Sequence, residues 1–127
     1  MAIKISKESY VLENQYLKKE IFLSKKSITS GKITNKLSGS YLDGLDSSEE
    51  FVLHFKGGLF GKTVKSSELK IEDTEILQTG ALNKLTVIFM QARIHNSSII
   101  IKAVYELSDF DRFFRKYLEI SFDDLYL

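Results

Sequence analysis

The chain has 127 residues, which predicts a single domain spanning residues 1–127. Hydrophobic residues make up 43% of the chain and charged residues 28%, values typical of a globular protein. The 18 basic residues nearly balance the 17 acidic ones, so the composition argues against a nucleic-acid-binding protein. Cysteine is absent, which excludes disulfides, thiolate nucleophiles and metal sites built from thiolates.

The beginning of the chain, MAIKISK, alternates isoleucine with lysine and lacks the continuous apolar stretch of a secretory signal. No later segment approaches the ~20 apolar residues that a membrane-spanning helix needs. We therefore expect a cytoplasmic protein, or a mature fragment of a longer one, that does not bind a membrane.

The first half of the chain predicts short strands. Residues 16–23 place Leu17, Ile21 and Leu23 on one side, and residues 51–55 (FVLHF) are rich in strand-forming types. Pairs that end in glycine predict the turns between these strands. These pairs are Ser30-Gly31, Ser38-Gly39, Asp43-Gly44, Gly57-Gly58 and Thr79-Gly80.

The second half contains the clearest hairpin signal. Residues 84–95 (KLTVIFMQARIH) carry apolar side chains on both faces at the start, as in a buried strand. Residues 98–107 (SIIIKAVYEL) place apolar side chains on one face at 99, 101, 103, 105 and 107, with Lys102 and Glu106 on the other. Only a short polar segment separates the two, so we predict a hairpin that turns at Asn96–Ser97.

The C-terminal segment allows two interpretations. Phenylalanines at 110, 113 and 114, followed by further apolar residues, fit one face of an amphipathic helix. Leu118, Ile120 and Phe122, however, alternate with polar residues as in a strand. We predict a turn at residues 109–114 and a strand from Arg115. The fold class is therefore all-β, mainly antiparallel, with a β-sandwich as the architecture and a small barrel or sandwich with a C-terminal helix as the alternative.

One glycine-rich segment, KGGLFGKT (56–63), resembles a phosphate-binding loop but has Lys56 where that motif requires glycine. The segment that follows alternates like a strand and does not open a helix. We interpret these residues as a flexible loop in which Leu59 and Phe60 form a candidate interface.

The titratable residues do not suggest a catalytic or metal site. His54 and His95 lack the spacing of metal ligands, so we expect no metal and no cofactor. Adjacent acids at Glu49-Glu50, Asp109/Asp111 and Asp123-Asp124 fit solvated turns, and no catalytic residue is assigned.

Several segments, in this order, are similar to one known family. They are VLENQYLKKEI (11–21), GKITNKLSG (31–39), SEEFVLHF (48–55), SSELKI (66–71) and AVYELSDFDRFFRKYLEI (103–120). Together they resemble the N-terminal β-sandwich domain of α-galactosidase (melibiase)-type glycoside hydrolases. Residues 115–120 carry the resemblance most strongly.

The resemblance implies a galactose-mutarotase-like supersandwich, of which this chain would form about half. It also implies that the catalytic carboxylates belong to a separate barrel domain, so that the chain alone is not a hydrolase. The expected function is a non-catalytic accessory domain that packs on a catalytic barrel or on a homo-oligomeric second subunit and shapes the access of a carbohydrate. The alternative is a free-standing interaction module with no carbohydrate role.

Overall fold

The computed structural model describes residues 2–6, 9–24, 27–45, 48–56, 62–94 and 97–124. The elements of this part of the chain are strands and short 3-10 segments, and all strand pairs are antiparallel. The all-β prediction is therefore confirmed.

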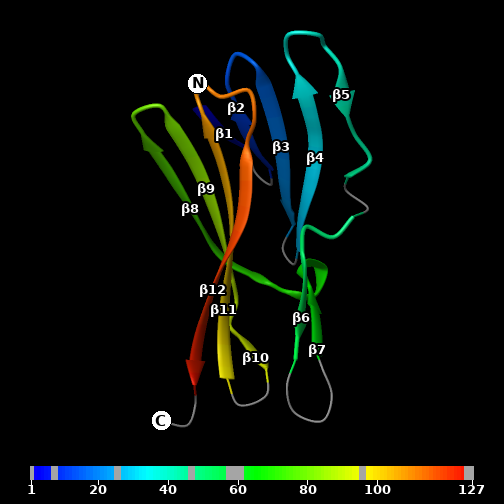
Figure 1. Ribbon diagram of the computed structural model, residues 1–127, viewed down its shortest axis with the longest axis vertical. Coiled ribbons are helices and arrows are strands. Elements are labelled where there is room, and N and C mark those ends of the chain that lie inside the picture. Colours follow the sequence, from blue (N-terminus) through cyan, green and yellow to red (C-terminus); the bar gives the residue numbers. More distant parts are fainter. Residues whose placement is uncertain are drawn as a thin grey trace.

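The first sheet is a simple meander in which each strand pairs with the next one along the chain (Figure 1). Antiparallel neighbours can be joined by short turns, which suits the short connections of this half. Its strands are β1 (Ala2–Ser6), β2 (Ser9–Glu13), β3 (Leu17–Ser24), β4 (Ser27–Asn35) and β5 (Tyr41–Leu42).

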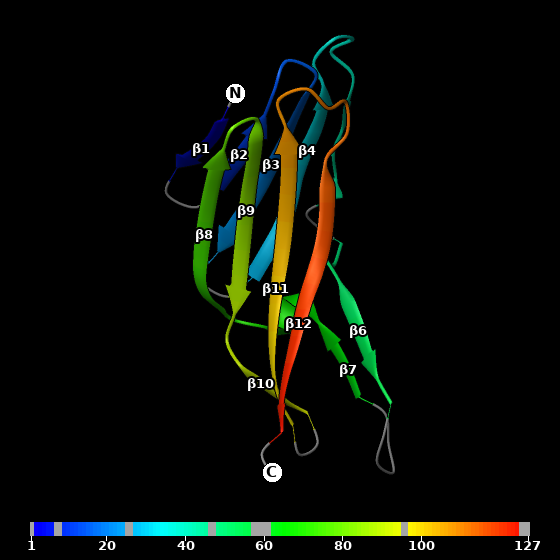
Figure 2. The same cartoon turned by 60° about the vertical axis from the view of Figure 1, so that its left-hand side comes forward.

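The second sheet is built around β11, which pairs with β12 on one side and with β9 and β10 on the other. The predicted strand 84–95 is thus two strands that share one neighbour, with a break at residues 90–91. β12 lies at an edge of this sheet (Figure 2). The strands are β8 (Ile71–Thr79), β9 (Leu82–Phe89), β10 (Ala92–Ile94), β11 (Ser97–Ser108) and β12 (Arg115–Asp124).

The predicted hairpin is confirmed by the pairing of β10 with β11, in which Ile94 lies opposite Ser97. The connection between them, residues 95–96, falls outside the described residues. The strand predicted from Arg115 is also confirmed. Leu118 and Ile120 lie opposite Ala103 and Ile101, so the alternation of β12 continues the inner face of β11.

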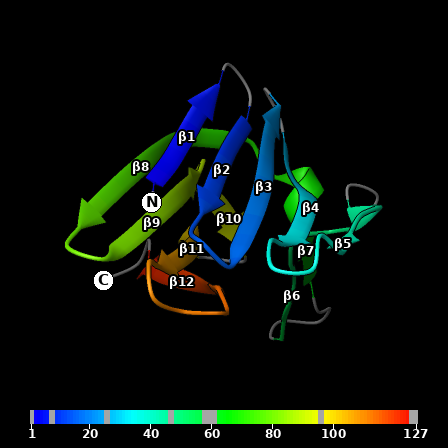
Figure 3. The same ribbon diagram turned by 90° about the horizontal axis from the view of Figure 1, so that it is seen from above.

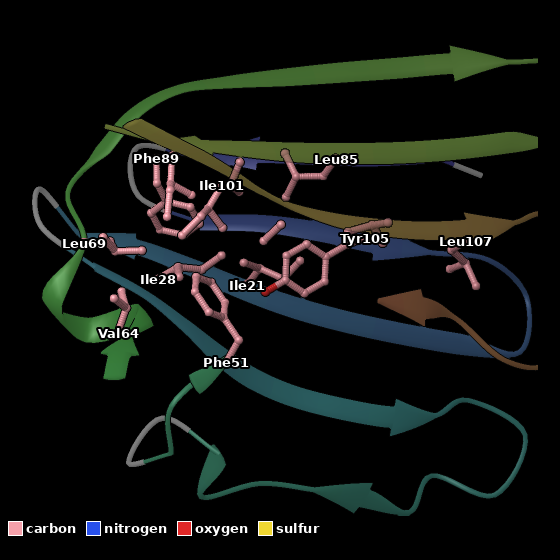
Figure 4. Packing of buried hydrophobic residues seen from close by; sticks show 14 residues of the cluster. Ile21, Ile28, Phe51, Val64, Leu69, Leu85, Phe89, Ile101, Tyr105 and Leu107 are labelled. Carbon is pink, nitrogen blue, oxygen red and sulfur yellow. The ribbon is translucent and has the colours of Figure 1, made fainter. Parts of the chain in front are cut away.

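The two sheets face each other as a sandwich, seen from above in Figure 3. Figure 4 shows the apolar side chains that fill the space between them. The core takes Leu12, Ile21 and Ile28 from the first sheet and Leu85, Val87, Phe89, Ile99, Ile101, Ala103, Tyr105 and Leu107 from the second.

The sheets are joined differently at their two sides. At one side β1 contacts β8 and β9, and the hydroxyl of Tyr10 lies 3.0 Å from that of Thr74. The other side contains the hairpin of β6 (Val52–Phe55) and β7 (Lys62–Lys65), with the 3-10 turn η2 (Ser66–Glu68). Phe51, Val64 and Leu69 from this region complete the core.

One predicted turn is wrong: Ser30 and Gly31 lie inside β4. The register between β3 and β4 shifts here, because Lys19 pairs with Ile33 while Ile21 pairs with Ser30. An ideal Cβ on Gly31 would collide with the ring of Phe22, so the glycine allows that ring to lie over β4. Glycine at this position therefore marks a bulge and a close approach.

Three other predicted glycine turns are confirmed. Gly39, Gly44 and Gly80 lie in connections between strands and have φ of 78°, 78° and 58°, in the left-handed region that glycine tolerates best. The remaining pair, Gly57-Gly58, falls outside the described residues.

Replacing Gly31 with alanine tests the close approach at the bulge. We expect Gly31→Ala to lower the free energy of unfolding by about 1–3 kcal/mol, because the new methyl group would displace the Phe22 ring and lie 2.9 Å from the Cβ of Glu20. Chemical denaturation measures the loss. The exposed neighbour provides the control, and Lys32→Ala should change stability by less than about 0.5 kcal/mol. Equal stability of the two variants would contradict this account.

Candidate functional site

A buried carboxylate, Glu50, lies where the first sheet leads into the β6–β7 hairpin. The prediction of a solvated turn acid is wrong at this position, because Glu50 is only 9% exposed. The hydroxyl of Ser30 donates to its two oxygens at 2.8 and 2.7 Å, and the hydroxyl of Tyr105 donates to Oε1 at 2.5 Å. The ammonium of Lys116 lies 3.2 Å from the same oxygen and 2.6 Å from the Glu50 carbonyl oxygen.

The secondary structure explains why these donors converge. Ser30 projects from β4 next to the bulge, whereas Tyr105 and Lys116 lie opposite each other on β11 and β12 and so share one face. Figure 4 shows Tyr105 directed into the space between the sheets. From the backbone side, the hydroxyl of Ser66 accepts hydrogen bonds from the amides of Glu50 and Phe51. The carboxylate thus connects both sheets and the hairpin region.

The surroundings keep Glu50 ionised. Burial by itself would raise the pKa of Glu50, but the hydrogen bonds from Tyr105 and Ser30 and the charge of Lys116 outweigh burial and hold that pKa below its usual value. Burial and the neighbouring carboxylate raise the pKa of the Tyr105 hydroxyl above its usual value. At neutral pH Glu50 is therefore ionised and the hydroxyl of Tyr105 keeps its proton. Two groups that keep these protonation states suit a structural role better than proton transfer.

A second charged group, Lys19 on β3, is buried beside this network with 2% of its surface exposed. Its Nζ has no hydrogen-bond partner in the described part of the chain. The ammonium lies 5.9 Å from the centre of the Phe114 ring. Burial lowers the pKa of Lys19 to about 8, although the negative charge of Glu50 acts in the opposite direction. An ammonium in this environment is costly to the folded state.

Lys19 lines a cavity of about 240 Å³ at this side of the sandwich. Ser48 and Glu49 line it from an exposed position, and an oxygen of Glu49 accepts hydrogen bonds from the amide and hydroxyl of Ser67. The remaining lining residues are Ser30, Ile33, Leu45, Glu50, Phe114 and Lys116.

The loop that leads into Phe114 is anchored by a fully buried asparagine, Asn14. Its Nδ2 donates at 2.8 Å to the carbonyl oxygens of Ser108 and Asp111, and its Oδ1 accepts at 2.8 Å from the amides of Tyr16 and Leu17. The predicted turn at residues 109–114 is therefore confirmed, and its conformation is set by contacts with the β2–β3 connection.

This loop, residues 109–114, exposes two phenylalanines: Phe110 is 76% exposed and Phe113 is 51% exposed. Two arginines stack on neighbouring rings. The guanidinium of Arg112 lies 4.8 Å from the centre of the Tyr16 ring. The guanidinium of Arg115 lies 5.4 Å from the centre of the Phe113 ring. The loop combines exposed aromatic surface with positive charge.

Of the two histidines and the two candidate interface residues, the structure describes His54 alone. The candidate interface residues Leu59 and Phe60, and also His95, fall outside the described residues. His54 lies exposed on β6, with Nδ1 3.0 Å from the hydroxyl of Thr63. The described residues include no cluster of three or more His, Asp or Glu side chains able to hold a metal ion. They also include no helix long and apolar enough to cross a membrane.

Comparison with known proteins identifies no relative. No family model matches the chain, and no curated protein or solved structure matches it. The resemblance to α-galactosidase-type hydrolases therefore stays a prediction, as does the galactose-mutarotase-like form of the sandwich.

The buried tyrosine offers a test of the carboxylate network. Tyr105→Phe keeps the ring but removes a donor to Glu50, so we expect the free energy of unfolding to fall by about 1.5–3 kcal/mol. Tyr117→Phe is the matched control, because its hydroxyl also donates to a carboxylate, Glu106 at 2.6 Å, but nearer to solvent. This variant should lose less than about 1 kcal/mol. Similar losses in the two variants would show that burial does not strengthen the network.

Replacing the buried lysine should stabilise the protein. We expect Lys19→Met to raise the free energy of unfolding at pH 7 by about 1–3 kcal/mol, because methionine fills the same space without a buried charge. The pKa of Lys19 is lowered from 10.5 to about 8, so the folded state binds fewer protons than the unfolded state between these values. The stability of the wild type should therefore rise with pH across this window, and the advantage of Lys19→Met should shrink. Denaturation of both proteins at pH 7, 8 and 10 measures the difference between their free energies of unfolding. If the stability advantage of Lys19→Met grew with pH, the pKa of Lys19 would not be lowered by folding.

Proposed function

We propose that this chain is a non-catalytic accessory domain that binds another protein through the loop 109–114, and that its partner is the catalytic domain of a glycoside hydrolase. The observation that carries the proposal is the exposure of Phe110 and Phe113 on a loop anchored by Asn14. A loop already held in one conformation loses less entropy when it binds.

The composition of the loop also supports an interface. Aromatic residues and arginine are enriched at the centres of protein interfaces, and Phe110, Arg112 and Phe113 follow one another closely here. Large phenylalanine surfaces exposed to water favour burial against a partner. The loop 109–114 is thus the candidate interface that lies within the described residues. The interface predicted at Leu59 and Phe60 stays a prediction.

The choice of partner depends on the sequence resemblance. In the family that the chain resembles, a sandwich domain precedes the barrel that carries the catalytic carboxylates. The described structure is compatible with a non-catalytic role, because Ser30, Tyr105 and Lys116 hold the Glu50 carboxylate in place. A free-standing interaction module would use the same loop on an unrelated partner.

The proposal predicts binding to a catalytic barrel encoded by the same or an adjacent reading frame. Isothermal titration calorimetry with that purified barrel should show a complex that weakens at least tenfold in the double variant Phe110→Ser, Phe113→Ser. Leu77→Ser is the control, because Leu77 on β8 is 48% exposed and lies outside the loop. Both variants should unfold at nearly the wild-type denaturant concentration, because truncation of exposed side chains costs little.

Other results would overturn the proposal in distinguishable ways. Absence of binding to the barrel would favour the free-standing module. Equal weakening by Leu77→Ser would place the interface elsewhere. The chain alone should not hydrolyse aryl α-galactosides, and turnover that is lost in Glu50→Gln would show that the chain itself is catalytic.

A further inference from the structure

The cavity beside Lys19 is a second candidate binding site, which shares Phe114 with the loop 109–114 but not the exposed Phe110 and Phe113. Lysine is rarely buried without a partner, because removing an ammonium from water without a hydrogen-bond acceptor is expensive. The Nζ of Lys19 has no acceptor in the described residues. The folded protein therefore buries an unsatisfied donor at the end of a side chain that lines a cavity.

Four charged side chains line the cavity, namely Lys19, Glu49, Glu50 and Lys116. The Glu50 carboxylate already accepts hydrogen bonds from Lys116, Ser30 and Tyr105, and the Glu49 carboxylate accepts hydrogen bonds from Ser67. The ammonium of Lys19, by contrast, has no hydrogen-bond acceptor among the described residues, and a ligand with one anionic acceptor group would supply it.

The size and lining of the cavity restrict the ligand further. A cavity volume of about 240 Å³ limits the ligand to a small molecule. Ile33, Leu45 and Phe114 provide apolar surface for a hydrocarbon body. Glu49 lines the cavity from an exposed position, and hydrogen bonds from Ser67 lower its pKa, so it is ionised and disfavours a dianion such as phosphate.

We propose that this cavity binds a small organic monocarboxylate, whose oxygens accept hydrogen bonds from the ammonium of Lys19 and whose apolar part contacts Phe114 and Ile33. Nζ is covered in the ligand-free structure. Binding therefore requires the end of the Lys19 side chain to rotate toward the cavity it lines. The ligand satisfies the unpaired ammonium and should stabilise the folded state.

Butyrate is a suitable probe, because it has one negative charge and fits the cavity. In ¹⁵N-correlation NMR spectra at pH 7, butyrate should cause saturable shifts of the amides of Lys19, Ile33, Leu45 and Phe114. Butyramide has the same shape without the charge and should bind at least tenfold more weakly. Inorganic phosphate tests the charge, and saturable binding of phosphate in preference to butyrate would overturn the assignment of a monocarboxylate.

Variants connect the binding to Lys19. Lys19→Met should weaken butyrate binding at least tenfold while remaining folded, because that variant is expected to be more stable than the wild type. Lys18→Met is the matched control, since adjacent residues of a strand point to opposite faces, and it should bind butyrate as the wild type does. Absence of saturable shifts in the wild type, or unchanged binding by Lys19→Met, would exclude the site. Neither result bears on binding of the barrel by the loop 109–114.

Discussion

The burial of one carboxylate constrains much of this fold. An ionised Glu50 between the sheets would cost several kcal/mol without donors, so Ser30, Tyr105 and Lys116 must all reach it. These three residues come from β4, β11 and β12, and the register of each strand is therefore tied to the same group. The side of the sandwich that contains the β6–β7 hairpin is thus joined by a charged network as well as by apolar packing.

The bulge between β3 and β4 belongs to the same arrangement. It brings Ser30 opposite Ile21, within reach of Glu50, and gives Phe22 room over Gly31. Lys19, at the other end of the bulge, gains no hydrogen bond from the described residues, and burying its ammonium costs free energy. Unfavourable groups that persist in a fold are often found where a protein binds a ligand. The hydrogen bonds to Glu50 therefore favour the folded state, whereas the buried ammonium of Lys19 disfavours it. Ligand binding would explain why a lysine is kept at this position.

A second polar anchor, Asn14, acts just before the N-terminal end of β12, the end at which Lys116 lies. It holds the loop 109–114 through two carbonyl oxygens, so that Phe110 and Phe113 are presented to solvent from a defined backbone. Three residues further along the chain, Lys116 enters the carboxylate network, and Phe114 lines the cavity between the two regions. The same short segment thus supplies the proposed interface and part of the proposed ligand site.

The sequence by itself determined several of the strands, because alternation is a local property. Leu118, Ile120 and Phe122 predicted β12 correctly, and left-handed glycines marked three of the turns. Local composition could not distinguish Gly31 in a bulge from glycine in a turn, since both exploit the missing side chain. The burial of Glu50 could not be predicted from the sequence either. Its hydrogen-bond donors lie 20, 55 and 66 residues away, and the residues next to the Glu-Glu pair do not indicate them. Only the tertiary structure, by packing one sheet against the other, decided that Glu50 is buried. It also decided that Lys19, on the apolar side of its strand, has no acceptor among the described residues.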